Sequence, residues 1–315
     1  MRGPVSRRPL AAAKGTRDGR IYADWAPVLS GTARELYAAE DFGIDWEQTV
    51  YALDGTTSAR GLSLFPWARY RAQPAAVKVP TRLDPPGHIP AFSAVTPAKI
   101  HEIHSLDARL PAPGARSIRD RAYLDCARLY TRQPGLAFFI IRSRQDFRFP
   151  RLRSHPGAKR TGRRCDQTLR RPSFYPAKFY PDPLRRLPYR AAETAKHLTF
   201  LTHNFLLPTL TLTQLYKGRW QVELFFKWIK PPLRIQRFYG LSPHAVKTQI
   251  WIALSVYVRV AIVRKRLGLE LNRSPMSQIL SLTLFEKMPL LQAFSQTNGT
   301  TELGLSCNQL DLFNL

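Results

Sequence analysis

Cysteine is scarce in this sequence. Its 315 residues include three cysteines, Cys126, Cys165 and Cys307, which lie far apart and form no CxxC pair. Disulfide frameworks and zinc modules both need several cysteines at short or regular spacings. The spacing therefore argues against a disulfide-stapled scaffold and against a cysteine-based zinc module, and it fits a reducing compartment.

A long apolar run is also lacking. The best membrane candidate, IWIALSVYVRVAIV at residues 250–263, carries Arg259 in its middle, and it is shorter than the roughly 20 apolar residues that cross a bilayer. The N-terminal stretch MRGPVSRRPLAAAKGTRDGR is basic but has no apolar core of a secretory signal. We expect residues 250–263 to form a buried core helix in a cytoplasmic protein without membrane contact.

Acidic residues are few. Asp and Glu number 22 against 48 Lys and Arg, which gives a net charge of +26 and a pI near 10.7. Such a chain repels itself unless it meets a polyanion. Genomic base composition alone could raise the arginine count, but the arginines recur in clusters such as RLRS and KRTGRR. Clustering favours nucleic acid as the partner.

Two aspartates stand where strand-like runs stop. TVYALD is β-branched and aromatic and reaches Asp54 before GTT, and ARSIRD reaches Asp120 before a helix that starts near Ala122. Residues 75–84 and 89–96 read as a hairpin around a PPG turn, and LAFFIIRS reads as a buried strand. The pattern predicts a sheet that carries acids at the ends of two strands.

Changes in composition divide the chain. From residue 144 to 205 it is rich in Pro, Arg and Tyr with short apolar runs, and from residue 209 it has helical periodicity over 209–230, 243–266 and 277–295. The expected organisation is a basic N-terminal segment and helix at 1–45, a first core part at 46–143, a β-rich insertion at 144–205, a helical second core part at 206–295 and a polar tail at 296–315.

The helix around Glu223 has a narrow polar face. With Tyr216 as the origin, Arg219 falls at about −60°, Glu223 at about −20° and Lys230 at about −40° on a helix of 100° per residue. The opposite side is apolar and would pack into a core. An exposed i,i+4 ion pair explains this face, and so does a metal-binding carboxylate flanked by phosphate-binding cations. The spacing alone leaves both interpretations open.

The spacing Y-x2-R-x3-E-x6-K around these residues resembles the signature of the DDE transposases of bacterial insertion sequences, in particular the insertion-sequence-four family. The segments TVYALDGTT, DRAYLDCARLY and RWQVELFFKWIK also resemble family segments and follow in the family's order. The resemblance runs from about residue 17 almost to the C-terminus. It implies an α/β fold of the RNase H-like type, in which a mixed sheet is flanked by helices and interrupted by a β-rich insertion.

The same resemblance implies a chemistry. The enzyme would cut transposon ends and join them to target DNA by two-metal phosphoryl transfer, using two Mg²⁺ ions for which Mn²⁺ can substitute. Its partners would be double-stranded DNA, as terminal inverted repeats and as target, and a second subunit on paired ends, in the bacterial cytoplasm at the nucleoid. Carried over by position, the catalytic and metal-binding residues are Asp54, Asp120 and Glu223, and the DNA-binding residues are Tyr216, Arg219 and Lys230.

Several positions depart from the family pattern. Pro80 would remove a ladder hydrogen bond, and Ala122 would cost on the order of 1 kcal/mol if its position required a positive φ. Pro231 and Pro232 would end the helix soon after Lys230. These departures support the alternative of a truncated or decayed, catalytically inactive DNA-binding remnant. A generic RNase H-like nuclease would share the acids but would not require the Tyr-Arg-Glu-Lys helix.

Other conspicuous residues have a structural interpretation. Asp84 and Asp125 are expected to be structural carboxylates beside the proposed acids. The aromatic residues of the Glu223 helix are expected to be core residues rather than stacking platforms for bases, although Trp220 borders the polar face. These aromatic residues are Trp220, Phe225, Phe226 and Trp228.

Overall fold

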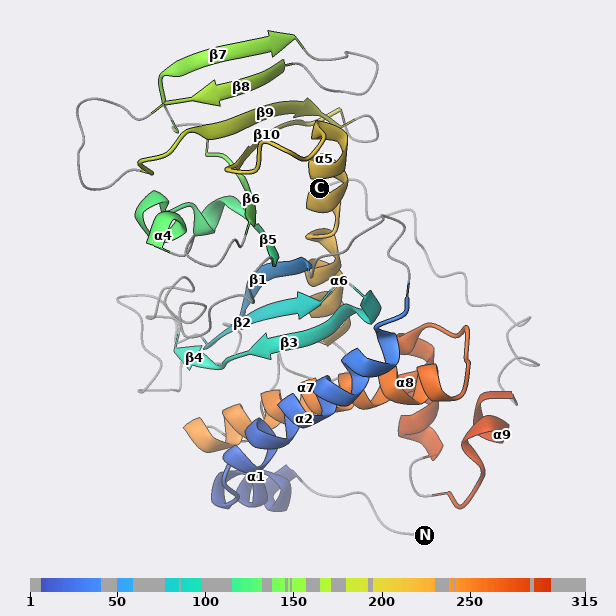
Figure 1. The fold of residues 1–315 in the computed structure, drawn as a ribbon. Coiled ribbons are helices and arrows are strands. Elements are labelled where there is room, and N and C mark those ends of the chain that lie inside the picture. Colours follow the sequence, from blue (N-terminus) through green and yellow to red (C-terminus); the bar gives the residue numbers. More distant parts are fainter. Residues whose placement is uncertain are drawn as a thin grey trace.

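One mixed sheet organises the computed structural model of the chain (Figure 1). The structure describes residues 7–40, 50–58, 77–84, 86–97, 115–131, 138–144, 147, 149–156, 165–170, 180–191, 195–229, 238, 240, 242–283 and 286–295. The sheet has ten strands in the order β3-β2-β1-β5-β6-β10-β9-β8-β7, with β4 beside β2. The strands are β1 Val50–Ser58, β2 Val77–Asp84, β3 Ile89–Ser93, β4 Thr96–Pro97, β5 Arg116–Arg119, β6 Phe138–Arg142, β7 Arg151–Pro156, β8 Cys165–Leu169, β9 Leu184–Arg190 and β10 His197–Thr202.

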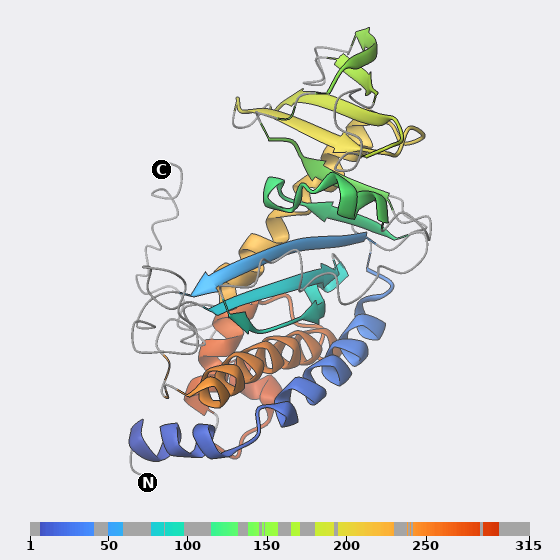
Figure 2. The same cartoon turned by 90° about the vertical axis from the view of Figure 1, so that its left-hand side faces the viewer.

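The five strands β3-β2-β1-β5-β6 have the RNase H-like arrangement. β1 is antiparallel to β2, and β2 to β3, whereas β1 runs parallel to β5 and β5 runs parallel to β6. Helices pack on the sheet, among them α2 Arg20–Tyr37 and α4 Cys126–Thr131, and Figure 2 shows α2 beside the β2–β3 hairpin. α1 Arg7–Thr16 packs on α7, Pro243–Arg266, instead. The expected α/β fold with a mixed sheet flanked by helices is therefore confirmed.

β1 is longer than its sequence pattern predicts. We expected a strand that stops at Asp54, but β1 continues to Ser58, so Asp54 lies in the middle of the strand. The two neighbours of β1 differ in extent: the parallel pairing with β5 ends at Leu53, whereas the antiparallel pairing with β2 continues to Ser58. Asp54 is therefore the first residue beyond the parallel pairing. The GTT stretch stays extended because β2 supplies it with a partner.

Pro80 lies inside β2 without breaking it. Its carbonyl accepts from Ala94 N at 3.1 Å, and in an antiparallel strand the N–H and C=O of one residue point to the same side. Its missing N–H therefore faces away from β1, at the gap between Lys78, which pairs with β4, and Thr81, which pairs with β3. The expected loss of a ladder bond thus does not affect the pairing of β2 with β1.

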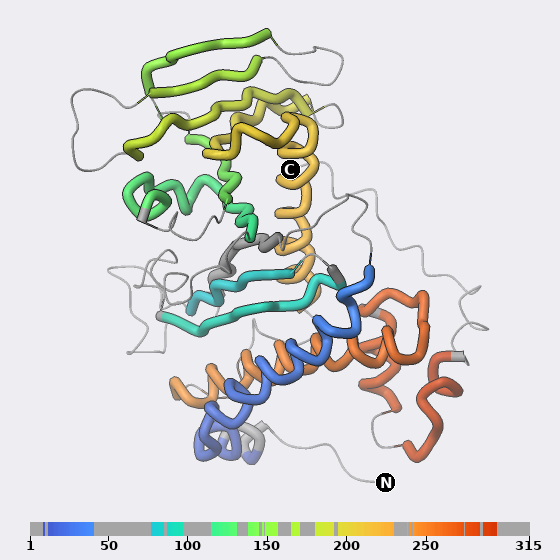
Figure 3. The backbone as a smooth tube through the Cα atoms, viewed as in Figure 1, coloured from blue at the N-terminus to red at the C-terminus, as the bar shows by residue number. Residues whose placement is uncertain are grey.

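The strands between residues 151 and 202 extend the core sheet. β10 pairs antiparallel with β6, and β9, β8 and β7 follow outward in turn. Figure 3 shows the backbone rising from β6 through these strands and returning along α5, Thr209–Lys217, and α6, Trp220–Ile229. The segment expected as a β-rich insertion is thus joined to the core by backbone hydrogen bonds.

Residues on alternate sides of these strands pack under different helices. Ile118, Ile140 and Phe200 form a cluster with Leu212 and Tyr216 of α5. On the other side, a second cluster joins the sheet to α4; its members include Cys126, Leu129, Phe139, Ile141, Leu184 and Leu201. Side chains alternate between the faces of a sheet, so α5 and α4 cover opposite faces.

The predicted helix over 209–230 is in fact two helices. Gly218 and Arg219 form a turn between α5 and α6, and the bonds Arg219 N to Tyr216 O and Val222 N to Arg219 O, both 3.0 Å, are of the tighter i to i−3 kind. The prediction of one helix over 277–295 was also wrong, because α8 ends at Thr283 and Pro289 precedes α9. These helices are α8 Arg273–Thr283 and α9 Leu290–Ser295.

The helix predicted at 243–266 is confirmed as α7, Pro243–Arg266. The Ser242 hydroxyl accepts from Ala245 N at 3.1 Å and caps its start, and Pro243 occupies the first turn. In the part of the chain that the structure describes, α7 is the one helix long and apolar enough to cross a bilayer, but 67% of its most apolar stretch is buried inside the protein. It is the core helix that the sequence predicted.

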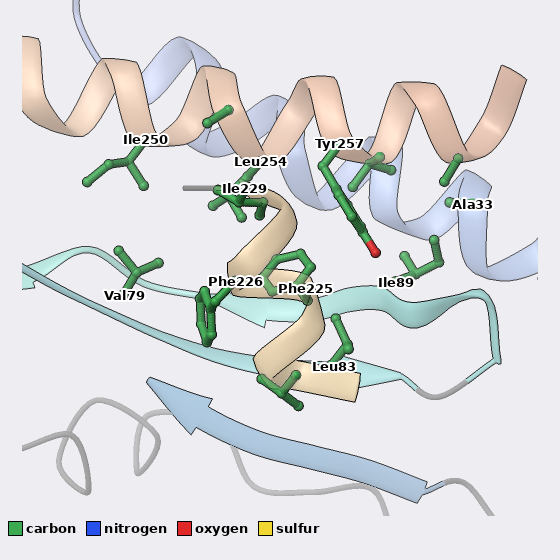
Figure 4. Packing of buried hydrophobic residues seen from close by; sticks show 14 of the residues in the cluster. Ala33, Val79, Leu83, Ile89, Phe225, Phe226, Ile229, Ile250, Leu254 and Tyr257 are labelled. Atoms are coloured by element: carbon green, nitrogen blue, oxygen red, sulfur yellow. The ribbon is translucent and has the colours of Figure 1, made fainter. Parts of the chain in front are cut away.

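α6 is enclosed between the sheet and α7. Figure 4 shows Phe225, Phe226 and Ile229 of α6 lying between β2 and the side chains of Leu254 and Tyr257 on α7. The rings of Phe225 and Tyr257 meet edge to face with centroids 4.8 Å apart. Burial of several large side chains, each contributing about 1.5–3 kcal/mol, holds α6 by its apolar face and leaves its polar face to form a site.

The carboxylates expected to be structural do have structural contacts. Asp84 accepts from Arg34 Nε at 2.8 Å and joins the end of β2 to α2. Burial raises the pKa of Asp84, and the hydrogen bond from Arg34 opposes that shift. Asp125 accepts from the backbone N of Arg128 at 3.2 Å at the start of α4. Both therefore belong to the framework.

The turn between β2 and β3 depends on a glycine. Gly87 has φ +62°, and a Cβ at this position would overlap the ring of Tyr37. Tyr37 is 1% exposed and donates to Ala261 O at 2.9 Å, so its ring cannot move without disturbing α7. Arg273 donates to Gly87 O and to the hydroxyl of Tyr257, which adds a link from α8.

Replacement of Gly87 by alanine should destabilise the fold more than the same change at Gly268. Both glycines have φ +62°, but a Cβ at Gly268 meets nothing within 4 Å. Gly268→Ala should lower the free energy of unfolding by about 1 kcal/mol through backbone strain, and Gly87→Ala by about 2–4 kcal/mol through strain and overpacking together. Urea denaturation of the two variants measures the difference; equal midpoints would contradict the role of Tyr37.

Candidate active site

The register of β1 and β5 places Asp54 and Asp120 side by side in the backbone. Leu53 pairs with Arg119 at the end of the parallel ladder, and the next residues of the two chains are Asp54 and Asp120. Neighbouring strands lie about 4.8 Å apart. The side chains of β1 lie outside the described residues, so this neighbourhood is one of backbone positions. The pairing of β1 with β5 brings together the two aspartates that the sequence predicted as site residues.

Asp120 stands at a strand end, as predicted. It follows β5 and precedes a short 3₁₀ turn, η4, Arg121–Tyr123, with φ −81° and ψ 166°. Ala122 of this turn is not among the described non-glycine residues with positive φ. Alanine at position 122 therefore causes no backbone strain, and the turn after Asp120 does not require a glycine there.

Tyr216 links Asp120 to α5. Its hydroxyl donates to Asp120 Oδ1 at 3.3 Å, and its ring, 8% exposed, packs on Phe200 with centroids 4.5 Å apart. Burial raises the pKa of Tyr216, Arg219 lowers it, and the nearby charge of Asp120 raises it again. The phenol therefore remains a protonated donor to the carboxylate.

Arg219 links the same tyrosine to Glu223. Its guanidinium carbon lies 5.6 Å from the centroid of the Tyr216 ring, and its Nη2 is 2.7 Å from Glu223 Oε1. Burial lowers the pKa of Arg219, but its interactions with Tyr216, Glu223 and Asp120 outweigh burial, and the pKa is raised overall. The arginine is thus held as a fixed positive charge between the tyrosine and the glutamate.

Glu223 is partly open to solvent, on a helix that packs against the core strands. Its side chain is 36% exposed, against 12% for that of Arg219, and α6 packs against β1, the strand of Asp54. Tyr216, Arg219 and Glu223 do share one polar face as the helical spacing predicted, although a turn separates the two helices. Lys230, the fourth residue of the motif, lies outside the described residues.

The start of α5 is anchored by one arginine from β9. Arg185 donates to Asp166 of β8, with Nη2 2.6 Å from Oδ2, and to the carbonyls of Asn204 and Leu207 at 3.2 and 2.6 Å. It also donates to the Thr209 hydroxyl at 3.2 Å. Arg185 is 7% exposed. These bonds fix the loop that leads from β10 into the helix of Tyr216.

Trp220 is exposed, and the prediction that it belongs to the core was wrong. It is 57% exposed at the first position of α6, next to Arg219, and Leu224 one turn later is 41% exposed. Phe225 and Phe226 take the core positions instead. On the helical wheel Trp220 falls about 60° from Glu223, at the edge of the polar face, and its exposure agrees with that position.

The donors gathered here suit a hard divalent cation. Asp54, Asp120 and Glu223 offer only oxygen ligands, as Mg²⁺ and Mn²⁺ prefer. Among the side chains that the structure describes, no three His, Cys, Asp or Glu residues form a metal-binding cluster. The side chain of Asp54 is not among the described side chains. The carboxylates of Asp120 and Glu223 are donors of the type that such an ion prefers.

A sheet of RNase H-like order with acids at the β1–β5 junction and a glutamate on a facing helix defines a class of nucleic-acid phosphoryl-transfer enzymes. Residues 45–259 match the family described as the transposase DDE domain. Because the match covers more than half of the chain, this protein belongs to the DDE transposases of insertion sequences. The family uses divalent metal ions, and its members are polynucleotidyl transferases.

Individual relatives agree with this assignment. Transposase y4zB of Sinorhizobium fredii is 29% identical over 274 residues, which cover 86% of this chain and 73% of that protein. The transposase for insertion sequence element IS5377 of Geobacillus stearothermophilus is 26% identical over 219 residues, 65% of this chain and 54% of that protein. The chain thus spans about half the length of the second relative.

Among solved structures, a cryo-EM structure of the piggyBac transposase synaptic complex with hairpin DNA is similar with a TM-score of 0.44. Its sequence is 11% identical, and the match covers 82% of this chain and 58% of that one.

Removal of Arg185 should destabilise the protein because it leaves Asp166 unpaired. Arg185→Leu leaves the carboxylate of Asp166 without its bidentate partner and should lower the free energy of unfolding by about 3–5 kcal/mol. The double variant Arg185→Leu/Asp166→Asn removes the stranded charge and should recover part of that loss. Urea unfolding measures both; a double variant no more stable than Arg185→Leu would show that the backbone contacts, not the ion pair, dominate.

Proposed function

We propose that Asp54, Asp120 and Glu223 are the catalytic acids of this transposase, and that the enzyme cuts transposon ends and joins them to target DNA. The observation that carries the proposal is the chain of contacts from Asp120 through Tyr216 and Arg219 to Glu223, at the residue where β1 brings Asp54 beside Asp120. Residues distant in sequence converge on one end of the sheet.

The three carboxylates would hold two Mg²⁺ ions, with Mn²⁺ able to substitute. Bound there, such ions lower the pKa of an attacking water or 3′-hydroxyl and stabilise the leaving oxygen. The chain's own residues orient this ligand set. Tyr216 fixes Asp120 by a hydrogen bond, and Arg219 fixes Glu223 by an ion pair, so neither carboxylate has to be ordered when the DNA arrives.

Tyr216, Arg219 and Lys230 are proposed to position the DNA backbone. A guanidinium offers a planar set of donors that matches phosphate oxygens, and Arg219 carries this group beside Glu223. Lys230 would add a point charge. The substrates are proposed to be terminal inverted repeats and target duplex, bound by a homodimer on paired ends at the bacterial nucleoid.

The alternative of an inactive remnant loses two of its arguments. Pro80 fits β2 without affecting its pairing with β1, and Ala122 sits in a turn that needs no positive φ. Pro231 and Pro232 lie outside the described residues. The comparisons name transposases of insertion sequences, and they favour the enzyme over the remnant.

Glu223→Gln should abolish cleavage and leave DNA binding nearly unchanged. Loss of one metal-binding carboxylate removes several kcal/mol of transition-state stabilisation, which corresponds to about a thousandfold or more in rate. The measurement is nicking of a labelled terminal-repeat duplex in Mg²⁺ and in Mn²⁺. Glu270→Gln, an exposed glutamate after α7, is the matched control and should cleave normally. Wild-type cleavage by Glu223→Gln would exclude that residue from the site.

Trp220→Ala should weaken binding to a cut or distorted end more than binding to intact duplex. An exposed indole beside Arg219 can stack on an unpaired base, and such stacking contributes about 1–3 kcal/mol per base. Phenylalanine at the same position should retain most of the effect. Competition binding with a terminal-repeat duplex that has an unpaired end base, against the fully paired duplex, tests the preference. An unchanged ratio would assign Trp220 to another contact.

A further inference from the structure

A second basic site lies beside the proposed acids. A pocket of about 260 Å³ is lined by Arg121, Arg142, Arg144 and Arg186, with His197 and Thr199 at the start of β10. A water molecule takes up about 30 Å³ in the liquid, so the pocket has room for a tetrahedral anion and part of its hydration. Arg121 follows Asp120 directly in the chain, which places the pocket next to the acids.

The lining of the pocket comes from both faces of the sheet. Arg186 pairs with Leu201 across β9 and β10, and Leu201 packs in the cluster under α4. Cross-strand partners point to the same face, so Arg186 points to the α4 side. Tyr216 packs on the α5 side with Ile140 and Phe200. Arg142 pairs with Phe200 and so points to the α5 side. The pocket therefore lies at the end of β6, between Arg142 on the Tyr216 side and Arg186 on the α4 side.

The charge of this pocket is not balanced by its own lining. Four arginines face it, and its described lining includes no Asp or Glu. Arg186 Nε is buried and has no hydrogen-bond partner among the described residues. Arg144 Nε donates to the backbone oxygen of Arg121 at 3.2 Å. Buried guanidinium donors without acceptors are unfavourable. An anion with several acceptor oxygens would satisfy them.

The pocket is built on rigid elements. Arg142 ends β6 and Arg186 lies in the middle of β9, while Ser143 N donates to Thr199 O at 2.7 Å and holds the end of β6 to β10. Sites on strands hold their donors more closely than sites on loops. The arrangement is thus prepared for a ligand before that ligand binds.

We propose that this pocket binds a backbone phosphodiester of DNA, separate from the phosphate at the acids. The proposal rests on the proposed function, since it takes DNA to be the substrate. With one phosphate at Asp120 and Glu223 and another between Arg186 and Arg144, the strand passes around the ends of β5 and β6 from the α5 face to the α4 face. The second phosphate fixes the direction in which the DNA leaves the site.

Salt dependence of DNA binding tests this role of the pocket. The slope of log affinity against log salt falls by about 1 for each phosphate that the protein no longer neutralises. Arg186→Gln and the exposed Arg144→Gln should each reduce the slope by about 1 and lower affinity at least about tenfold. Arg186→Lys should keep the slope. Arg266, exposed at the end of α7, is not in the lining of the pocket, so Arg266→Gln removes the same charge elsewhere and should change neither quantity.

Methylphosphonate substitution identifies the phosphate. Neutralising one phosphate at a time in a terminal-repeat duplex should reveal one position at which wild-type affinity falls and Arg186→Gln causes no further loss. A position found instead in the target duplex, measured by strand transfer, would assign the pocket to target DNA. Unchanged salt slopes in both pocket variants, or no position that couples to Arg186, would overturn the proposal. Failure of the wild-type protein to bind either duplex would overturn the proposed function as well.

Discussion

The parallel pairing of β1 with β5 is the constraint on which the site depends. Its register ends at Leu53 and Arg119, and the two aspartates follow as the next residues of chains that are otherwise far apart. On the other side of β1, the antiparallel pairing with β2 continues past Asp54 and keeps that residue in extended backbone. A slip of one residue in either pairing would turn one aspartate to the opposite face of the sheet. The chemistry of the site is therefore fixed first by backbone hydrogen bonds.

The glutamate reaches the same place through packing. α6 contributes Phe225, Phe226 and Ile229 to the core between β2 and α7, and this burial sets the rotation of the helix. Arg219, in the turn before α6, then has Tyr216 on one side and Glu223 on the other. Because Arg185 fixes the entry to α5, both ends of this helical segment are held by groups from different parts of the chain. The side chains of the polar face are held in fixed positions because the buried apolar face of α6 cannot move.

Local features of the sequence predict much of this arrangement. The hairpin after Asp54, the strand end at Asp120, the helix at 243–266 and the shared face of Tyr216, Arg219 and Glu223 all follow from periodicity and turn residues. The length of β1 does not, because it depends on the extent of β2. The division of 209–230 into two helices depends on a tight turn within a run of helix-forming residues, and the Arg185–Asp166 pair joins strands that no spacing rule connects. What the sequence could not supply is the pairing of distant segments.

The continuous sheet has a mechanical consequence. The outer strands are coupled to β6 by the backbone bonds of β10, and Arg185 ties β8 and β9 to the start of α5. The strand ladder offers no flexible joint at which these outer strands could swing relative to the acids. A duplex that touches both parts must adapt its own shape to the fixed distance between them, so the elastic energy of bending or fraying is stored in the nucleic acid.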